Sequence, residues 1–238
     1  MVTTSIAMMK VLEENGVKPD VAAGLSLGEY CALVAAGVMT ADDAIRTVRE
    51  RGILMQEAVP AGVGGMSAVL GMTADEINAV VDEIPNVQVA NYNCPGQIVI
   101  SGLKEAVEIA AVKLKEAGAR RVIPLNVSGP FHSYLLEEAG EKLGKFLENI
   151  PVSEPKIPYV ANVTAAYVTK AEDVKPLLTR QVSSSVRWQQ SVETMLADGV
   201  DRFIEIGPGK TLAGFIRKIN REATVINIEK FEDLEKLN

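Results

Sequence analysis

The sequence contains a single histidine, His132, among its 238 residues. A zinc site built from several histidines is therefore excluded, and any chemistry that pairs a serine with a histidine must use His132. The two cysteines, Cys31 and Cys94, form neither a metal-binding spacing nor a disulfide framework. We therefore expect no metal, and a reducing, cytoplasmic setting fits the chain best.

Positive charge and long apolar runs are also scarce. The 24 Lys and Arg residues face 31 Asp and Glu, which gives a formal net charge of −7. Such a surface disfavours nonspecific nucleic-acid binding, because contacts to phosphate need an excess of cations. No apolar run approaches the length of a membrane span, and no signal peptide opens the chain. We therefore expect neither a nucleic-acid partner nor a membrane partner.

Strand and helix patterns alternate along most of the chain. A helix is predicted over residues 3–15, and the short strand at 21–24 runs into Ser26 before a second helix. A capping pattern at Thr40 opens a third helix of about 18 residues. Further helices are predicted over 133–149, 172–181, 188–198 and 211–220, with strands at 159–162, 202–206 and 225–228. This alternation predicts an α/β fold with a mainly parallel sheet and helices on both faces.

Residues 62–127 show a different order of predicted strands and helices. Their predicted order is strand, helix, strand, strand, helix, strand, which is the pattern of a ferredoxin-like unit. The strands are expected at 66–70, 87–91, 97–101 and 121–125, with helices after Thr73 and over 104–117. We predict that this subdomain is inserted into a discontinuous α/β core formed by residues 1–61 and 128–238.

Gly24-Leu25-Ser26-Leu27-Gly28 has the spacing of a nucleophile elbow. In such an elbow the serine sits on a strained turn between a strand and a helix, and small residues two positions away on each side let the chain pack. The Leu27 amide can then donate to an oxyanion, and the helix dipole assists. A tight Gly-Ser-Gly turn with a structural role is the alternative.

His132 lies at a junction between a loop and a predicted helix, which is a common place for catalytic groups. A lone histidine is often a surface residue or a hydrogen-bonded core residue. Serine needs a base to become a competent nucleophile, however, and His132 is the sole histidine available to Ser26. We therefore interpret the two residues as a catalytic pair.

Arg51 lies on the helix that Thr40 opens. The neighbouring Gly52 indicates close packing on that side, and a buried guanidinium could hold a carboxylate in a bidentate pair. A solvated helix face is the alternative interpretation of Arg51.

Five segments together resemble the malonyl-CoA:acyl carrier protein transacylase family, in order and nearly end to end. They are Gly-Leu-Ser-Leu-Gly-Glu-Tyr at 24–30, Arg-Gly with Met-Gln-Glu-Ala within 51–58, Asn-Tyr-Asn-Cys-Pro-Gly-Gln at 91–97, the histidine segment at 128–132 and the Gly-Pro-Gly-Lys turn within 205–210. The set is far more specific than the elbow alone.

The resemblance implies a ping-pong transfer that feeds fatty acid synthesis, with malonyl-CoA and acyl carrier protein as partners and no cofactor. Ser26 would attack the thioester with help from His132, and Arg51 would pair with the free carboxylate of malonyl-Ser26. Family members orient the histidine with a backbone carbonyl, which Arg187 would supply here, and Asn162 matches an asparagine near the cleft. We expect a monomer.

Two departures from the family pattern stand out. Leu25 replaces the histidine that usually precedes the nucleophile, so altered packing or substrate orientation is expected there. The family's first strand and its Gly-Gln-Gly-Xaa-Gln loop, which supplies a second oxyanion donor, find no match in the chain. One such donor contributes about 2.7–4 kcal/mol of transition-state stabilisation.

Two other functions compete with malonyl transfer. An inactive fragment or binding-only fold would account for the unmatched loop. A serine hydrolase of the α/β-hydrolase or patatin-like kind would share the elbow, but it should show an HGGG-type loop or an Asp-Gly-Gly or Asp-Gly-Ala dyad segment, and neither is present: Val200 follows Asp198-Gly199.

Overall fold

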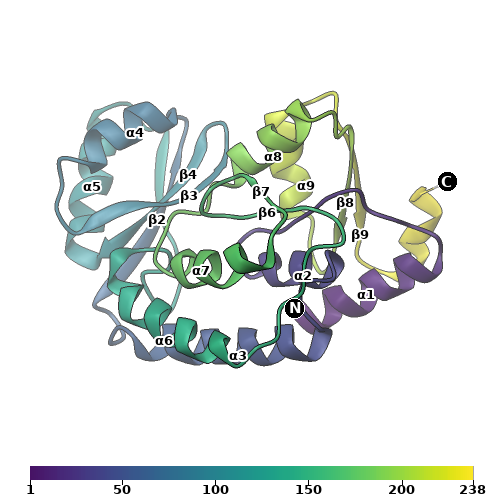
Figure 1. Cartoon of the computed structure of the whole chain (residues 1–238). Helices are drawn as coiled ribbons and strands as arrows, with labels where there is room; N and C mark the ends of the chain where they lie inside the picture. The colour runs from purple at the N-terminus through teal and green to yellow at the C-terminus, as the bar shows by residue number, and fades with distance from the viewer. Residues whose placement is uncertain (238) are drawn as a thin grey trace.

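A computed structural model describes residues 1–237, and its helices and strands alternate along the chain (Figure 1). The helices are α1 (Val2–Glu14), α2 (Gly28–Ala35), α3 (Ala41–Glu57), α4 (Ala74–Val81), α5 (Lys104–Glu116), α6 (Glu137–Glu148), α7 (Ala171–Gln181), α8 (Trp188–Ala197) and α9 (Thr211–Ile219), with the 3-10 helices η1 (Tyr134–Leu136) and η2 (Phe231–Leu237). The strands are β1 (Ala22–Ala23), β2 (Gly64–Leu70), β3 (Val87–Cys94), β4 (Gln97–Leu103), β5 (Arg121–Pro124), β6 (Tyr159–Val160), β7 (Tyr167–Val168), β8 (Arg202–Ile206) and β9 (Thr224–Ile228). The predicted α/β class is confirmed.

Local signals in the sequence fix several helix starts. The Thr40 hydroxyl accepts a hydrogen bond from the Asp43 amide at 3.1 Å, which caps α3 as predicted. Thr73 and Glu76 form a reciprocal capping box at the start of α4. Because these caps satisfy amides that the first helical turn leaves unpaired, both helices begin where the sequence places them.

β2, β3, β4 and β5 form one antiparallel sheet in the order β3-β4-β2-β5. α4 and α5 pack on one face of this sheet and close a separate apolar core that includes Val69, Ile77, Ile100 and Leu114. Figure 1 shows this unit to one side of the remaining elements. A short parallel bridge between Asn91 on β3 and Val186 ties the sheet to the segment that precedes α8.

The other strands lie in two small sheets within residues 1–237. β1 pairs in parallel with β6, and β7 adds an antiparallel edge. β8 and β9 pair in parallel from Arg202–Thr224 to Ile206–Ile228. β7 was missed in the sequence, because a strand of two residues is too short to show an alternating pattern.

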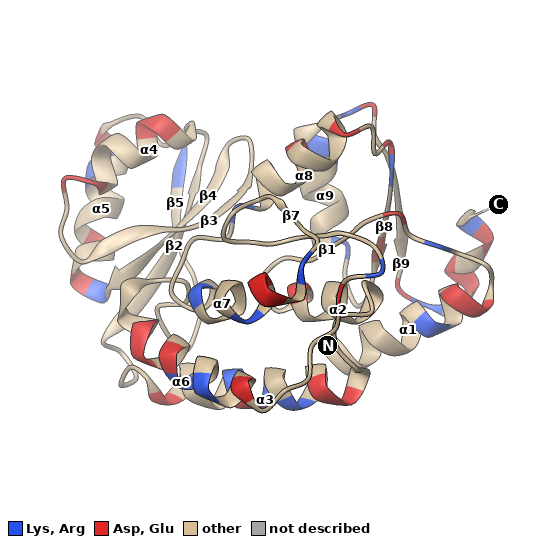
Figure 2. Ribbon diagram, in the orientation of Figure 1, with Lys and Arg blue, Asp and Glu red and all other residues tan. Residues whose placement is uncertain are grey.

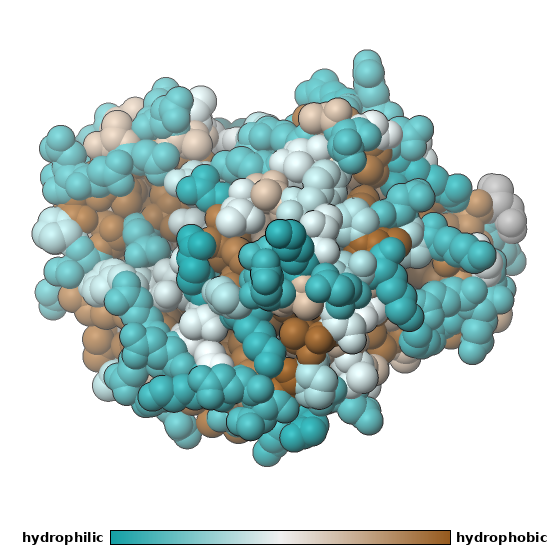
Figure 3. All heavy atoms as spheres, in the orientation of Figure 1, coloured by the Kyte–Doolittle hydropathy of each residue, from teal (hydrophilic) through white to brown (hydrophobic). Residues whose placement is uncertain are grey.

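The largest apolar core lies between α1, α2, α3, α6 and α7 and contains the fully buried Leu33, Leu143 and Leu178. Figure 2 shows acidic and basic residues along the ribbons of α3 and α6. Figure 3 shows hydrophilic residues along the lower edge of the molecule, with hydrophobic residues among them. In residues 1–237, no helix has both the length and the apolar character needed to span a membrane.

Two glycines let α6 approach α7 closely. A Cβ atom on Gly140 would lie 2.7 Å from the Thr179 carbonyl oxygen, and one on Gly144 would lie 2.9 Å from the Thr179 hydroxyl. Backbone cannot move aside as a flexible side chain can, so Gly140 is the stricter of the two positions. α7 ends at Gln181, and this close contact therefore sets where Gln181 lies.

We predict that Gly140→Ala destabilises the fold by about 1–3 kcal/mol, because the added methyl overpacks the contact between the two helices. Gly214→Ala on α9 is the matched control. No atom lies within 4 Å of its added Cβ, and alanine is about 1 kcal/mol better than glycine inside a helix. Urea unfolding followed by circular dichroism should lower the midpoint for Gly140→Ala and not for Gly214→Ala. Equal midpoints for the two variants would contradict the close contact.

Candidate active site

Ser26 lies on a tight turn between β1 and α2. Its backbone φ is +50°, in the left-handed region that non-glycine residues rarely adopt. A Cβ atom on Gly24 would lie 2.1 Å from the Gly28 carbonyl oxygen, so only glycine fits there, whereas a Cβ on Gly28 meets nothing within 4 Å. The predicted elbow geometry is present, and of its two glycines Gly24 is the one that it requires.

The Asn162 side chain forms two hydrogen bonds to the backbone of this turn. Its amide nitrogen donates to the Gly24 carbonyl at 2.7 Å, and its carbonyl oxygen accepts from the Ser26 amide. Asn162 is buried, with 1% of its surface exposed. The residue predicted near the cleft thus lies beneath the nucleophile turn and stabilises its strained backbone.

His132 contacts Ser26 directly. The Ser26 hydroxyl lies 2.7 Å from Nε2 of His132, and Nδ1 lies 2.9 Å from the Gln181 carbonyl oxygen. Because a carbonyl can only accept, Nδ1 carries the proton, and Nε2 is left to accept from the serine hydroxyl. His132 also has a positive φ of +57°, so both members of the pair occupy strained backbone.

The predicted role of Arg187 in orienting the histidine is wrong. The Arg187 carbonyl accepts hydrogen bonds from the amide and the hydroxyl of Ser191 at 2.9 and 2.8 Å, which begin α8. The histidine partner is the carbonyl of Gln181, the last residue of α7. The last carbonyls of a helix have no partner within it, so the end of α7 was the signal in the sequence that could have identified Gln181.

Arg51 lies on the buried face of α3, and only 6% of its surface is exposed. Its Nη2 donates to the Ser26 hydroxyl at 3.0 Å and to the side-chain oxygen of Gln181 at 3.1 Å, and its guanidinium lies 5.9 Å from the centre of the Tyr30 ring. A Cβ on Gly52 meets nothing within 4 Å, so the inference of close packing there was wrong. Arg51 is buried because it shares the inward face of α3 with Met55.

Glu29 is a buried residue of the site that the sequence analysis missed. Its Oε2 accepts from the Gln181 side-chain nitrogen at 2.7 Å and from the Asn162 amide at 3.2 Å. Burial raises the pKa of Glu29 to about 7, against the opposing effects of these hydrogen bonds and of the Arg51 charge. The signal in the sequence was the single charge within the otherwise uncharged helix α2.

Burial lowers the pKa of His132 to about 4, and the nearby Arg51 charge lowers it further, while hydrogen bonds to backbone carbonyls oppose both effects. Below that pKa the ring would be protonated and could not accept the serine proton. Near pH 7 the ring is therefore neutral and able to act as a base.

The Leu27 amide is available to an oxyanion. It makes no hydrogen bond within residues 1–237, and it precedes the first turn of α2, where unpaired amides favour negative charge. The Ser26 amide, in contrast, is committed to Asn162. The side chain of Leu25, which departs from the family pattern, packs against an apolar cluster around Trp188 and Phe215.

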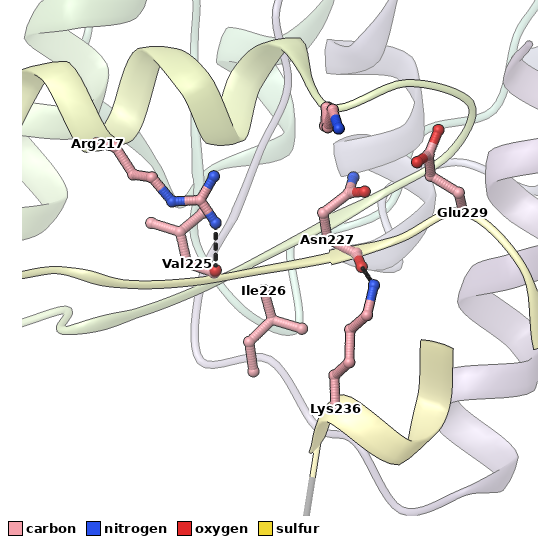
Figure 4. Close-up of a pocket in the computed structure, with 7 residues that line it drawn as sticks. Arg217, Val225, Ile226, Asn227, Glu229 and Lys236 are labelled. Atoms are coloured by element: carbon pink, nitrogen blue, oxygen red, sulfur yellow. Dashed lines mark hydrogen bonds between the residues drawn. The ribbon is translucent and has the colours of Figure 1, made fainter. Parts of the chain in front are cut away.

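The surface of the described residues carries two open pockets. One, of about 360 Å³, is lined by Gln88, Tyr134, Ser183 and neighbouring polar residues, and Gln88 also donates to the His132 carbonyl at 3.2 Å. The other, of about 450 Å³, lies beside β9 between Arg217 and Lys236 (Figure 4). Neither pocket is lined by a residue whose side chain hydrogen-bonds to Ser26.

The arrangement of Ser26, His132 and the Leu27 amide fits acyl transfer through a serine ester. A family model described as "Acyl transferase domain" matches residues 1–231. The chain therefore belongs to the acyl transferase family.

Two relatives within this family share one name. It is 48% identical to the malonyl CoA-acyl carrier protein transacylase of Bacillus subtilis (strain 168), over 99% of the chain and 75% of that protein. The protein of the same name from Staphylococcus aureus (strain MRSA252) is 42% identical, over 100% of the chain and 78% of the relative.

Solved structures agree with these relatives. The acyl carrier protein S-malonyltransferase of Vibrio cholerae O1 biovar eltor superposes with a TM-score of 0.97 at 41% identity, covering 100% of the chain and 79% of that structure. A malonyl-transacylase in complex with a type II PKS acyl-carrier protein superposes with a TM-score of 0.96 at 40% identity, covering 99% and 77%.

We predict that His132 does not titrate between pH 5 and 8 in the native protein, because burial and the Arg51 charge hold its pKa near 4. As the sole histidine, it gives a single set of ring C–H signals in a heteronuclear NMR spectrum, so no other residue can be mistaken for it. The urea-unfolded chain is the control and should titrate near pH 6.5. A native midpoint above pH 6 would show that the ring is exposed or paired with an acid.

Proposed function

We propose that this chain transfers a malonyl group from malonyl-CoA to the phosphopantetheine thiol of acyl carrier protein through a malonyl-Ser26 intermediate. The observation that carries the proposal is the buried Arg51 guanidinium, 3.0 Å from the nucleophile. The names of the similar proteins give malonyl-CoA and acyl carrier protein as substrates, and one similar structure holds an acyl-carrier protein.

In the first half of the reaction, the Ser26 oxygen attacks the thioester carbonyl and its proton passes to Nε2 of His132. The Leu27 amide donates to the carbonyl oxygen as that oxygen becomes negative. When the tetrahedral intermediate collapses, the carbon–sulfur bond breaks and His132 returns the proton to the departing CoA sulfur. The ester on Ser26 keeps the acyl group.

The second half repeats these steps with a different nucleophile. The carrier-protein thiol gives its proton to His132, and its sulfur attacks the serine ester. Collapse of the intermediate breaks the bond to the Ser26 oxygen, which recovers the proton. Protein groups and the two thiols supply every proton and electron pair, so the proposed reaction needs no cofactor.

Arg51 supplies the preference for an acyl group that carries a free carboxylate. Within residues 1–237 no carboxylate lies within ion-pair distance of its guanidinium, although the side chain is almost fully buried. A planar guanidinium binds a carboxylate through two parallel hydrogen bonds. The malonyl carboxylate is the partner that this buried cation lacks.

A serine hydrolase is less well supported. Its histidine would be expected to face an acid, whereas His132 faces the Gln181 carbonyl. A cation beside the nucleophile also suits a charged acyl group better than a neutral lipid.

We also propose that residues 62–127 form a ferredoxin-like subdomain inserted into an α/β core of residues 1–61 and 128–238. The antiparallel order β3-β4-β2-β5 and the separate apolar core under α4 and α5 support this division. The parallel pairs β1–β6 and β8–β9 support a mainly parallel core sheet. That the protein is monomeric and cytoplasmic also stays a prediction.

Incubation with malonyl-CoA should add one malonyl group to the wild-type chain, and intact-mass spectrometry should detect the adduct. Ser26→Ala should form no adduct, because no other group replaces the serine oxygen. Subsequent addition of holo acyl carrier protein should remove the adduct and produce malonyl carrier protein. A wild-type chain that never acquires the adduct would favour a binding-only fold.

Arg51→Ala should lower the preference for malonyl-CoA over acetyl-CoA by roughly tenfold to a hundredfold, the range expected when hydrogen bonds to a charged group are lost. The measurement is the ratio of the second-order rate constants for acylation of Ser26 by the two thioesters. A partly unfolded variant loses both rates equally, so the ratio reports on selectivity alone. An unchanged ratio would rule out Arg51 as the carboxylate partner.

A further inference from the structure

The Gln181 side chain joins three groups of the site, although the mechanism above uses only its backbone carbonyl. Its nitrogen donates to Oε2 of Glu29 at 2.7 Å and to the Ser26 carbonyl at 3.1 Å, and its oxygen accepts from Arg51 at 3.1 Å. Its surface is fully buried. Water therefore cannot replace any of these contacts. All three depend on the orientation of this one amide.

The chemistry of its two neighbours fixes that orientation. A guanidinium has only donors, so Arg51 can contact only the oxygen of the amide. An ionised carboxylate has only acceptors, so Glu29 can contact only the nitrogen. With both neighbours in place, a rotated amide would place like groups against each other on both sides, which leaves a single favourable orientation.

Glu29 is itself held so that it faces Gln181. The same oxygen, Oε2, accepts from the Asn162 amide at 3.2 Å, and 1% of the Glu29 surface is exposed. Asn162 in turn holds the turn that carries Ser26. A buried acid is costly unless it is hydrogen-bonded, and these two bonds aim its charge at the amide that contacts Arg51.

We propose that Glu29 is a positioning residue that acts through the Gln181 amide to hold the Arg51 guanidinium beside Ser26, and so sets the preference for acyl groups with a free carboxylate. The inference rests on the proposed function and deepens it. It assigns to the acid of the nucleophile motif an effect on which acyl group is accepted, beyond any contribution to the fold.

The test is a double-mutant cycle on the ratio of malonyl-CoA to acetyl-CoA acylation rate constants, measured at pH 8, above the Glu29 pKa of about 7. Gln181→Met removes the amide but keeps the side-chain volume and the backbone carbonyl that contacts His132. It should lower the ratio roughly tenfold, because Arg51 loses its acceptor. Glu29→Gln can present either an oxygen or a nitrogen to Gln181, and it should lower the ratio roughly threefold or more.

The double variant distinguishes a relay from two separate effects. If Glu29 acts through Gln181, Glu29→Gln adds nothing once the amide is gone, and the double variant should match Gln181→Met within about twofold. A double variant whose ratio falls by the product of the two single-variant effects would overturn the relay. An unchanged ratio in both single variants, alongside a lowered ratio in Arg51→Ala, would overturn the inference while leaving malonyl transfer intact. A wild-type chain that forms no malonyl adduct would instead contradict the proposed function.

An exposed pair of the same residue types provides the control. On α8 the Gln189 side chain donates to Glu193 at 2.8 Å, and neither residue contacts the site. Gln189→Met and Glu193→Gln should leave the ratio unchanged. Should Glu29→Gln not fold, Glu29→Asp keeps the charge and withdraws the oxygen by one methylene, so it should also lower the ratio; a ratio equal to that of wild type would count against the proposal.

Discussion

The burial of the Arg51 guanidinium beside Ser26 is the constraint on which the site depends. A charge removed from water is stable only when protein groups replace the lost hydration. Gln181, the Ser26 hydroxyl and the face of Tyr30 provide that replacement. Glu29 lies one amide away and adds a compensating charge when it is ionised, above its pKa of about 7. The same cation helps to keep His132 neutral. One buried charge thus both prepares the base and leaves donors for a ligand carboxylate.

The backbone strain of the site is held by the same set of contacts. Ser26 and His132 both have positive φ values, which cost free energy unless the surroundings impose them. Asn162 bonds both sides of the serine turn, while the end of α7 and the side chain of Gln88 hold the histidine. The close contact between α6 and α7 fixes that helix end, so core packing is transmitted to the catalytic pair.

Much of this could be predicted from the sequence, because the deciding signals are local. The elbow around Ser26 and the caps at Thr40 and Thr73 depend on residues a few positions apart, and the structure places them as predicted. The partner of His132 could not be derived in that way. It is a backbone carbonyl that any residue could supply, so side-chain identity does not distinguish Arg187 from Gln181, and only the predicted end of α7 pointed to Gln181.

A carbonyl partner for the histidine also suits the proposed substrate. An ionised acid beside the ring would stabilise the imidazolium, but its negative charge would repel a malonyl carboxylate bound a few ångströms away. The Gln181 carbonyl orients the ring and carries only a partial charge. The acid of the site, Glu29, faces the Gln181 amide and contacts neither the ring nor the serine hydroxyl. The charge of Arg51 therefore remains available to the acyl group, and the histidine still has the tautomer that the reaction needs.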